Sequence, residues 1–384
     1  MRICHATTFY PNRYGHTHYT DALIAAMRRH RPERHFIAAE FGSDFADTEA
    51  YHCVPCFGRD LDYVEPIVDV ARGFRADLVI VQYTDDLFGH DGRLPRLLRR
   101  LREAGIATLV NAHSVYPQSH RRAYSPGHDA GHLDRALASE ASSLMVHTAR
   151  MRQELLDRGV PADKVAVIPH GTYVLPVPDP LESRRRVGVA EDAKVIVFFG
   201  FIWLGKGLEF LLEVFARVLR QVPAAQLLIG GTTFNDAFYA RAYLAYLRAR
   251  TYQLRIARRT RLWGDYVSDE LVPHFFSAAD VVAFPYRQGY SSVSGVLHQA
   301  VGLGRPVVCS RIAKFEEVAE QVAPELLVGP RDREGWTRQL VRLLSDDDYA
   351  MAASKRAWRF AGRTSWDVVA LEQLQLCDRL VDSR

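Results

Sequence analysis

Short apolar runs that alternate with amphipathic segments dominate this chain of 384 residues. The runs at 195–199, 281–284 and 307–309 are typical of parallel strands that are covered on both faces. The segments between such runs have the apolar spacing of helices. Strands that alternate with helices form right-handed βαβ units, so the sequence predicts an α/β protein with doubly wound parallel sheets.

The alternation forms two series, and a chain of this length suggests two domains. A proline-rich stretch at 172–181 separates the series and is interpreted as a linker. The first series has predicted strands at 3–7, 36–39, 78–82, 108–112, 144–146 and 165–168. The second has predicted strands at 195–199, 226–229, 262–263, 281–284, 307–309 and 326–327. Ligands of paired sheets of this kind bind at the carboxyl ends of the strands.

The composition limits the class of partner. Hydrophobic residues make up 48% and charged residues 24%, as in a globular protein, and no apolar run has the roughly 18 residues of a membrane span. The first residues look like a strand and not a signal peptide. A net charge of +4 is too small to indicate nucleic acid. The basic clusters at 96–102 and 248–261 are either solvated helix faces or surfaces that touch anionic lipid or an acidic substrate.

Five scattered cysteines are typical of a reducing compartment, so a cytoplasmic location is expected. Cys53 and Cys56 form a single Cys-x-x-Cys without a second pair or a histidine at ligand spacing. Ordinary thiols are the favoured interpretation of this pair, and a metal or redox site is the alternative. The sequence carries no signal for the oligomeric state.

A polar loop and a helix start lie between two of the apolar runs, in the stretch FPYRQGYSSVSGVLHQAVGLGRPVVCS at 284–310. Ser291, Ser292, Ser294 and Gly295 precede a predicted helix over 296–303. The first N–H groups of a helix are unpaired and carry partial positive charge, and small residues let an anion come close. The pattern indicates either a phosphate-binding site or a capped helix with nothing bound.

Three more positions follow predicted strand ends. Lys206 lies in FGFIWLGKG, where a strand ends in glycine and a helix begins, and its ammonium could stabilise a diphosphate. Gly15 lies between the first strand and the first helix, in NRYGHT, and permits close backbone approach. His113 follows the strand in LVNAHSVY, a usual place for a histidine that contacts substrate. The alternatives are a surface lysine and a structural histidine.

Together these motifs resemble the family-4 retaining glycosyltransferases of the GT-B fold over nearly the whole chain. The similarity lies in the strand, glycine and Lys-Gly helix at 198–215, and in VAVIPHG at 165–171. It continues in the donor-site segments at 279–285 and 299–308, and in the Ser-Trp-Asp start of the last helix at 365–367. The resemblance implies two doubly wound Rossmann-like domains that face each other across a cleft. It divides the chain into an acceptor domain at 1–174 and a donor domain at 175–364, with the helix at 365–384 packed back on the first.

The resemblance also implies an activity: retaining transfer of a sugar from a nucleotide-diphosphate donor to a polar hydroxyl acceptor, without a cofactor or a required metal. Lys206 matches the family's phosphate-binding lysine, and His113 matches its histidine beside the transferred sugar. Gly15 and His16 fall at its N-terminal glycine loop. The remaining positions implied for donor binding are Tyr266 and Val267 at the base, and Ser291, Ser292, Ser294, Gly295, Val296 and Gln299 at the sugar, ribose and phosphates.

Three positions depart from the family's pattern. Phe201 stands where the family usually has arginine, and Ser291 and Gln299 stand where it usually has two glutamates. The amide oxygen of Gln299 could still accept one ribose hydrogen bond. A charged hydrogen bond contributes roughly 1.5–3 kcal/mol, so loss of the arginine should weaken donor binding unless another cation replaces it. Arg287, in the loop before the helix, is the candidate.

Two other functions stay open. The departures would also fit a glycosyltransferase-like scaffold that has lost transfer, which would bind no nucleoside diphosphate. An epimerase acting on a nucleotide-sugar shares the fold and would consume donor without acceptor. The loops at 83–91 and 115–130 are rich in Asp, His and Arg and suggest a polar acceptor: a glycan, a natural product or a lipid-linked molecule. A lipid-linked acceptor would place the protein at the inner face of the membrane.

Overall fold

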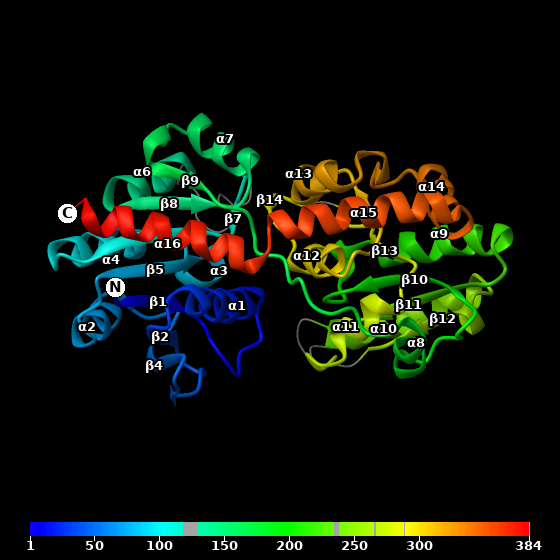
Figure 1. Cartoon of the computed structure of the whole chain (residues 1–384), viewed down its shortest axis with the longest axis horizontal. Coiled ribbons are helices and arrows are strands. Elements are labelled where there is room, and N and C mark those ends of the chain that lie inside the picture. The colour runs from blue at the N-terminus through cyan, green and yellow to red at the C-terminus, as the bar shows by residue number, and fades with distance from the viewer. Residues whose placement is uncertain (118–129, 234–237, 265, 288, 384) are drawn as a thin grey trace. The chain divides into compact units, whose positions relative to one another are not determined.

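The computed structural model describes residues 1–117, 130–233, 238–264, 266–287 and 289–383. These residues form two compact units (Figure 1). The first contains Met1–Gly171, Tyr290–Val293 and Trp366–Arg384, and the second contains Thr172–Gly289 and Ser294–Ser365. Each unit is built on its own sheet, and each is considered by itself below.

The sheet of the first unit has the strand order β3-β4-β2-β1-β5-β6-β8-β9. Its strands are β1 (Ile3–Thr7), β2 (His35–Glu40), β3 (Ala46–Asp47), β4 (Tyr51–Phe57), β5 (Leu78–Tyr83), β6 (Ala107–Ala112), β8 (Ser143–Val146) and β9 (Val165–Val167). All neighbours are parallel except β3 and β4. The sequence analysis does not predict β4, because its partly exposed residues form no continuous apolar run.

Helices cover both faces of this sheet. They are α1 (Gly15–His30), α2 (Val64–Gly73), α3 (Asp85–Phe88), α4 (Arg93–Glu103), α6 (Ala130–Glu140), α7 (Ala149–Asp157) and α16 (Trp366–Asp382), with a 3-10 turn at Ala162–Lys164. Helix α4 contacts α2 and α6, and the C-terminal helix α16 packs along α1. Arg29 Nε donates to Asp367 Oδ1 at 2.6 Å and Arg31 Nη1 to Asp378 Oδ1 at 2.7 Å, which fixes α16 to this unit.

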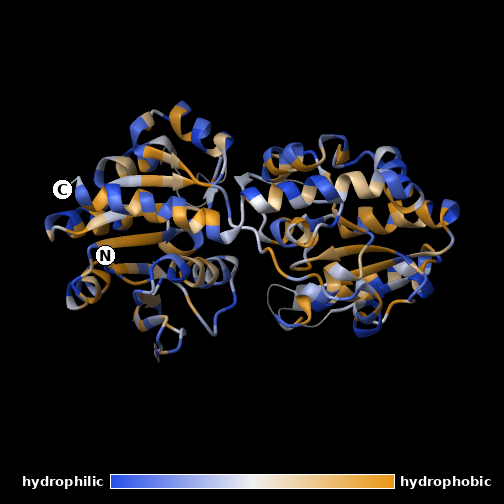
Figure 2. Ribbon diagram, in the orientation of Figure 1, coloured by the Kyte–Doolittle hydropathy of each residue, from blue (hydrophilic) through white to orange (hydrophobic). Residues whose placement is uncertain are grey.

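The second sheet is fully parallel, with the order β12-β11-β10-β13-β15-β16. Its strands are β10 (Lys194–Phe199), β11 (Ala225–Gly230), β12 (Thr260–Leu262), β13 (Val281–Phe284), β15 (Val307–Ser310) and β16 (Leu327–Val328). The strands are apolar almost throughout, as Figure 2 shows, because both faces are covered.

The helices of the second unit are α8 (Pro180–Val187), α9 (Leu208–Gln221), α10 (Phe238–Gln253), α11 (Val272–Ser277), α12 (Gly295–Gly302), α13 (Ala313–Val322), α14 (Arg333–Ser345) and α15 (Asp347–Arg363). Short 3-10 turns occur at Leu204–Lys206, Ala257–Arg259 and Pro324–Leu326. The predicted linker at 172–181 runs into α8, a helix that the sequence analysis does not predict. Its start is set by Asp179, whose side chain accepts from Glu182 N at 2.7 Å, and by proline at the first helical position.

The doubly wound arrangement predicted from the alternation is confirmed in both units. In the first sheet the strand order reverses between β1 and β5, and in the second between β10 and β13. Loops that leave neighbouring strands at such a point diverge, which opens a crevice at the carboxyl ends of the strands. In the second sheet the loops at this point follow Phe199 and Phe284, and both loops carry predicted site residues.

Candidate active site

The loop after β10 needs glycine at two positions. Gly200 has φ +136° and Gly207 has φ +71°, conformations that residues with side chains rarely adopt. A Cβ on Gly207 would also lie 2.0 Å from the carbonyl oxygen of Pro285, in the loop that follows β13. The two loops beside the reversal therefore touch, and Lys206 is held between the two glycines in the turn at Leu204–Lys206.

Tyr286 is the residue against which Lys206 packs. The Lys206 Nζ atom lies 3.8 Å from the centre of the Tyr286 ring, a cation–π distance. Among the described residues no carboxylate forms an ion pair with Lys206. Burial, together with the smaller effect of the charge of Lys314, lowers the pKa of Lys206 to about 7. A lysine that is desolvated in this way gains most from an anion.

Helix α12 begins at the same place. Ser294 caps it by accepting from Leu297 N at 3.3 Å, as the predicted capped helix requires. A hydrogen bond links Ser294 to the Tyr286 phenol, whose pKa burial raises above its usual value. A Cβ placed on Gly200 would lie 3.9 Å from both Tyr286 Oη and Val296 Cγ2. The structure thus gathers Lys206, Gly200 and the start of α12 around Tyr286.

The other residues predicted near this helix differ in position. Gly295 is exposed at the first turn of α12, and Gln299 is partly buried one turn further on. Ser291 and Ser292 do not join the helix start: they form β14 (Ser291–Ser292), which pairs with β7 (Ser114–Val115) in the first unit. The Ser291 hydroxyl donates to Glu154. The sequence analysis placed these serines at the helix start because only four residues, Tyr290–Val293, belong to the first unit. So short an excursion leaves no signal in the sequence.

Three further predicted donor contacts lie on loops of the second unit. Tyr266 is half exposed and its hydroxyl donates to Asp269 at 3.2 Å. Val267 is buried. Arg287 is exposed; its N–H donates to Gly205 O at 3.1 Å, and its charge acts on Tyr243 of α10. Their roles in donor binding stay predictions.

In the first unit, Gly15 opens α1, and a Cβ added there would meet no atom within 4 Å. His16 stacks on Tyr14 with ring centres 5.7 Å apart. Its Nε2 atom is buried without a hydrogen-bond partner among the described residues. Burial lowers the pKa of His16 to about 4, so the ring is neutral at physiological pH.

His113 follows β6, and its Nε2 atom is hydrogen-bonded. Its Nε2 donates to Gln82 Oε1 at 2.8 Å, and its Nδ1 lies 3.4 Å from His147 Nε2. Because a glutamine oxygen only accepts, the neutral ring carries its proton on Nε2. Burial lowers the pKa of His113 well below its usual value, and the rings of His147 and His16 lower it further. The ring centres of His16 and His113 are 6.5 Å apart, which brings two predicted residues together.

Sequence reasoning missed the residues that hold His113. Gln82 and Asn111 are polar residues in otherwise apolar strands, and the register of β5 and β6 pairs them directly. Asn111 Nδ2 donates to Gln82 Oε1 at 2.9 Å. Tyr19 packs edge-on against His113, with ring centres 4.7 Å apart. The signal that could have found Gln82 and Asn111 is an amide near the end of each of two neighbouring buried strands.

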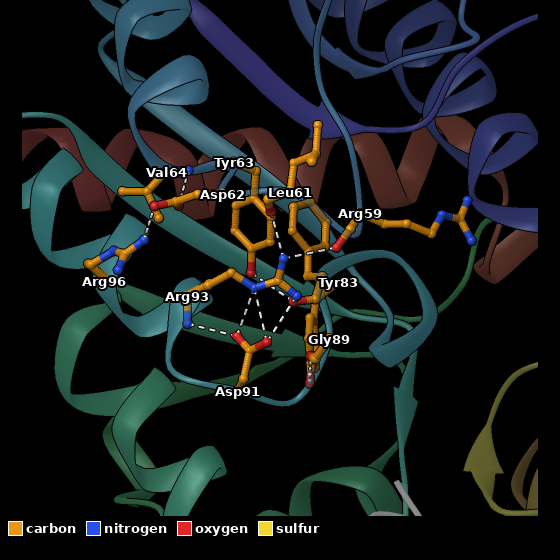
Figure 3. A network of polar contacts seen from close by, with 11 residues as sticks. Arg59, Leu61, Asp62, Tyr63, Val64, Tyr83, Gly89, Asp91, Arg93 and Arg96 are labelled. Carbon is orange, nitrogen blue, oxygen red and sulfur yellow. Dashed lines mark hydrogen bonds and ion pairs between the residues drawn. The ribbon is translucent and has the colours of Figure 1, made fainter. Parts of the chain in front are cut away.

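The acceptor-side loop at 83–91 is tied down by Arg93 (Figure 3). Arg93 Nη1 donates to Arg59 O at 3.0 Å and to Leu61 O at 2.6 Å, and Arg93 Nε donates to Asp91 Oδ2 at 3.0 Å. Arg93 therefore joins the loop after β4 to the loop before α4. The second predicted acceptor loop, at 115–130, lies outside the described residues from 118 to 129.

Ion pairs engage the first basic cluster, and the cysteines form no disulfides. The arginines of the first basic cluster pair with carboxylates: Arg96 with Asp62, Arg99 with Glu140, Arg100 with Glu65, and Arg102 with Glu140. All five cysteines are free thiols, and burial raises the pKa of Cys53 and Cys56 to about 12. Within the described ranges, no group of His, Cys, Asp and Glu has the geometry of a metal site. Among the described residues, none of the helices combines the length and the hydrophobicity that a membrane span requires.

Two family models match this chain. "Glycosyl transferase 4-like domain" matches residues 15–171, and "Glycosyl transferases group 1" matches residues 193–346. The chain belongs to the group 1 glycosyltransferases of the GT-B fold. The resemblance noted in the motifs is thereby confirmed, and the two models divide the chain near residue 171, where the two structural units also meet in sequence.

Relatives in this family carry glycosyltransferase names. A D-inositol 3-phosphate glycosyltransferase of Corynebacterium urealyticum is 32% identical over 197 residues, which is 50% of this chain and 45% of the relative. An uncharacterized glycosyltransferase of Methanocaldococcus jannaschii is 26% identical over 225 residues, 56% of this chain and 54% of the relative. The matched stretch thus spans about half the length of these curated relatives.

Solved structures of similar fold cover the whole chain. Sucrose-phosphate synthase from Thermosynechococcus elongatus has a TM-score of 0.78 at 18% identity and covers 100% of both chains. Anabaena HepE in complex with UDP and glucose has a TM-score of 0.74 at 15% identity and covers 99% of this chain and 100% of its own. At these identities the likeness shows the fold alone.

Proposed function

We propose that this family member transfers a sugar from a nucleotide-diphosphate donor to a hydroxyl group of a polar acceptor, with retention of anomeric configuration. The observation that carries the proposal is the gathering of Lys206, Gly200 and the α12 start around Tyr286, at the strand reversal of the second sheet. The first turn of α12 offers unpaired N–H groups, and Lys206 offers a desolvated charge. Both features would bind a diphosphate and stabilise the negative charge that it gains as it leaves the sugar.

The proposed chemistry needs no protein nucleophile. The acceptor oxygen attacks the anomeric carbon on the face that the diphosphate is leaving, the bond from that carbon to the phosphate oxygen breaks, and that oxygen takes the hydroxyl proton. The contribution of the protein is then positioning and charge stabilisation. His113, neutral and fixed in one tautomer by Gln82, is assigned to a hydrogen bond with the transferred sugar.

The names of relatives suggest which molecules to assay first. UDP is bound in the HepE structures, and D-inositol 3-phosphate appears in the names of several curated relatives. A donor panel of UDP-, GDP- and ADP-sugars should be tested with D-inositol 3-phosphate and with an extracted acceptor pool. Mass spectrometry would detect the product, and the anomeric coupling in proton NMR would report retention or inversion.

The same panel distinguishes the alternatives. Calorimetry that detects no binding of any nucleoside diphosphate would favour the scaffold. That alternative was suggested by Phe201, Ser291 and Gln299, which depart from the family's pattern. Donor that is converted without acceptor would favour the epimerase. For a transferase we expect product only when acceptor is present and a large loss of rate in Lys206→Ala. Full transfer by Lys206→Ala would refute the assignment of the diphosphate to this place.

A further inference from the structure

Lysine is scarce in this chain, and its distribution is informative. Only 5 of the 49 basic residues are lysines, and the other 44 are arginines. Two of these lysines, Lys206 and Lys314, follow carboxyl ends of strands in the second sheet: Lys206 lies in the loop after β10, and Lys314 is the second residue of α13, after β15. Arginine is always charged, whereas a lysine can lose its charge when it is desolvated, so the two residues are not interchangeable at a buried site.

Tyr286 and its loop connect the two lysines. One side of the Tyr286 ring holds Lys206 Nζ at 3.8 Å, and the ring also packs edge-on against Phe315, the neighbour of Lys314, with centres 4.8 Å apart. The loop containing Tyr286 then passes directly over α13. A Cβ placed on Gly289 would lie 3.1 Å from Lys314 Cβ. Both lysines therefore border the same loop.

The charges of the two lysines repel each other. Lys314 as a whole residue is partly exposed, yet burial of its ammonium lowers the pKa to about 8. Its charge is close enough to lower the pKa of Lys206 as well. Two neighbouring cations in a place of low polarity are each less stable than either one alone. A bound anion removes the penalty for both, and a diphosphate carries more than one negative charge.

We propose that Lys314 supplies the second positive charge for the diphosphate of the donor, in place of the arginine that is absent at Phe201. The inference rests on the proposed function, because it concerns the same ligand. Lys314 fits this role better than Arg287 does. Arg287 belongs to the same loop but is exposed and its charge acts on Tyr243 of α10, whereas Lys314 is partly buried beneath Gly289 and its charge acts on Lys206.

The test compares phosphate-dependent binding with binding of the nucleoside alone. Wild type, Lys314→Met, Lys314→Arg and Arg287→Met are titrated with UDP, GDP, ADP, the matching nucleosides and inorganic pyrophosphate. Lys355→Met, which removes an exposed lysine of α15 in the same unit, is the control. We expect Lys314→Met to weaken the preferred nucleoside diphosphate about 10-fold or more and its nucleoside less than 2-fold, because one charged hydrogen bond is lost. Lys314→Arg keeps the charge but not the geometry of the donors, so its affinity should lie between that of wild type and that of Lys314→Met, and Lys355→Met should match wild type.

A second readout separates charge from folding. Reductive methylation with ¹³C-formaldehyde labels the five lysines and the amino terminus, and the methyl signals titrate with pH in NMR. In Lys314→Met the titration midpoint of Lys206 should move upward, because a like charge has been removed. Wild-type affinity for the diphosphate in Lys314→Met, with an unmoved Lys206 midpoint, would overturn the inference alone. A wild-type protein that binds none of the three nucleotides would overturn the proposed function and this inference together.

Discussion

The substitution Gly171→Ala tests how the C-terminal helix is attached to the first unit. Gly171 ends the VAVIPHG motif, and Trp366 begins α16. A Cβ at position 171 would lie 2.1, 2.2 and 2.5 Å from three indole atoms of Trp366. Because non-bonded carbons rest about 3.5–4.0 Å apart, the ring must move by roughly 1.4 Å.

The surroundings of Trp366 oppose that movement. The side chain is 5% exposed and packs edge-on against Tyr19, with ring centres 5.0 Å apart. Overpacking of a core usually costs about 1–3 kcal/mol, and removal of a buried tryptophan side chain costs about 3–5 kcal/mol. We expect Gly171→Ala to lower the free energy of unfolding by about 2–4 kcal/mol, between these limits. For a domain of 150–250 residues this lowers Tm by roughly 5–15 °C.

Differential scanning calorimetry measures the loss, and hydrogen exchange followed by mass spectrometry shows whether α16 opens first. The matched control is Gly73→Ala at the end of α2, where a Cβ meets no atom within 4 Å. It should leave the protein unchanged or up to about 1 kcal/mol more stable. Trp366→Leu should cost less in the Gly171→Ala background than in wild type, because the smaller side chain removes the clash. A Gly171→Ala protein with the Tm of wild type would refute the reasoning.

Three further outcomes are expected. Burial lowers the pKa of Lys206 to about 7, so binding of a nucleoside diphosphate at pH 8 should take up a proton, and the affinity should fall as the pH rises from 6 to 9. Calorimetry in buffers of different ionisation enthalpy measures the proton uptake and the affinity, and Lys206→Met should abolish the uptake. The carboxylate introduced by Gln82→Glu should raise the pKa of His113, so the transfer rate of this variant should fall as the pH is lowered from 8 to 5, a fall that wild type lacks. Identical pH–rate profiles of the variant and wild type would contradict the role of Gln82. Arg93→Met should lower the free energy of unfolding by about 1.5–3 kcal/mol and speed hydrogen exchange in the loops at 59–61 and 89–91. Unchanged exchange in these loops would show that Arg93 does not hold them.

Much of this protein could be predicted from its sequence, because the relevant signals are local. The apolar strands, the glycine-flanked Lys206 and the cap at Ser294 each depend on residues within one or two turns of chain. Backbone periodicity, φ preference and capping are encoded at that range, so most strands of both sheets could be predicted before any contact was known. The strand β4 and the helix α8 escaped because a half-exposed strand and a proline-led helix give weak periodic signals.

The tertiary structure alone decided which side chains meet. Gln82 contacts His113 because β5 and β6 are neighbouring strands in register. Lys206 packs on the ring of Tyr286 because the strand order reverses between β10 and β13, which makes the loops after these two strands neighbours. The serines of β14 pair in the first unit although their neighbours in sequence belong to the second. Such contacts join residues that are tens of positions apart. Strand order and register fix them, and no local pattern in one sequence specifies either.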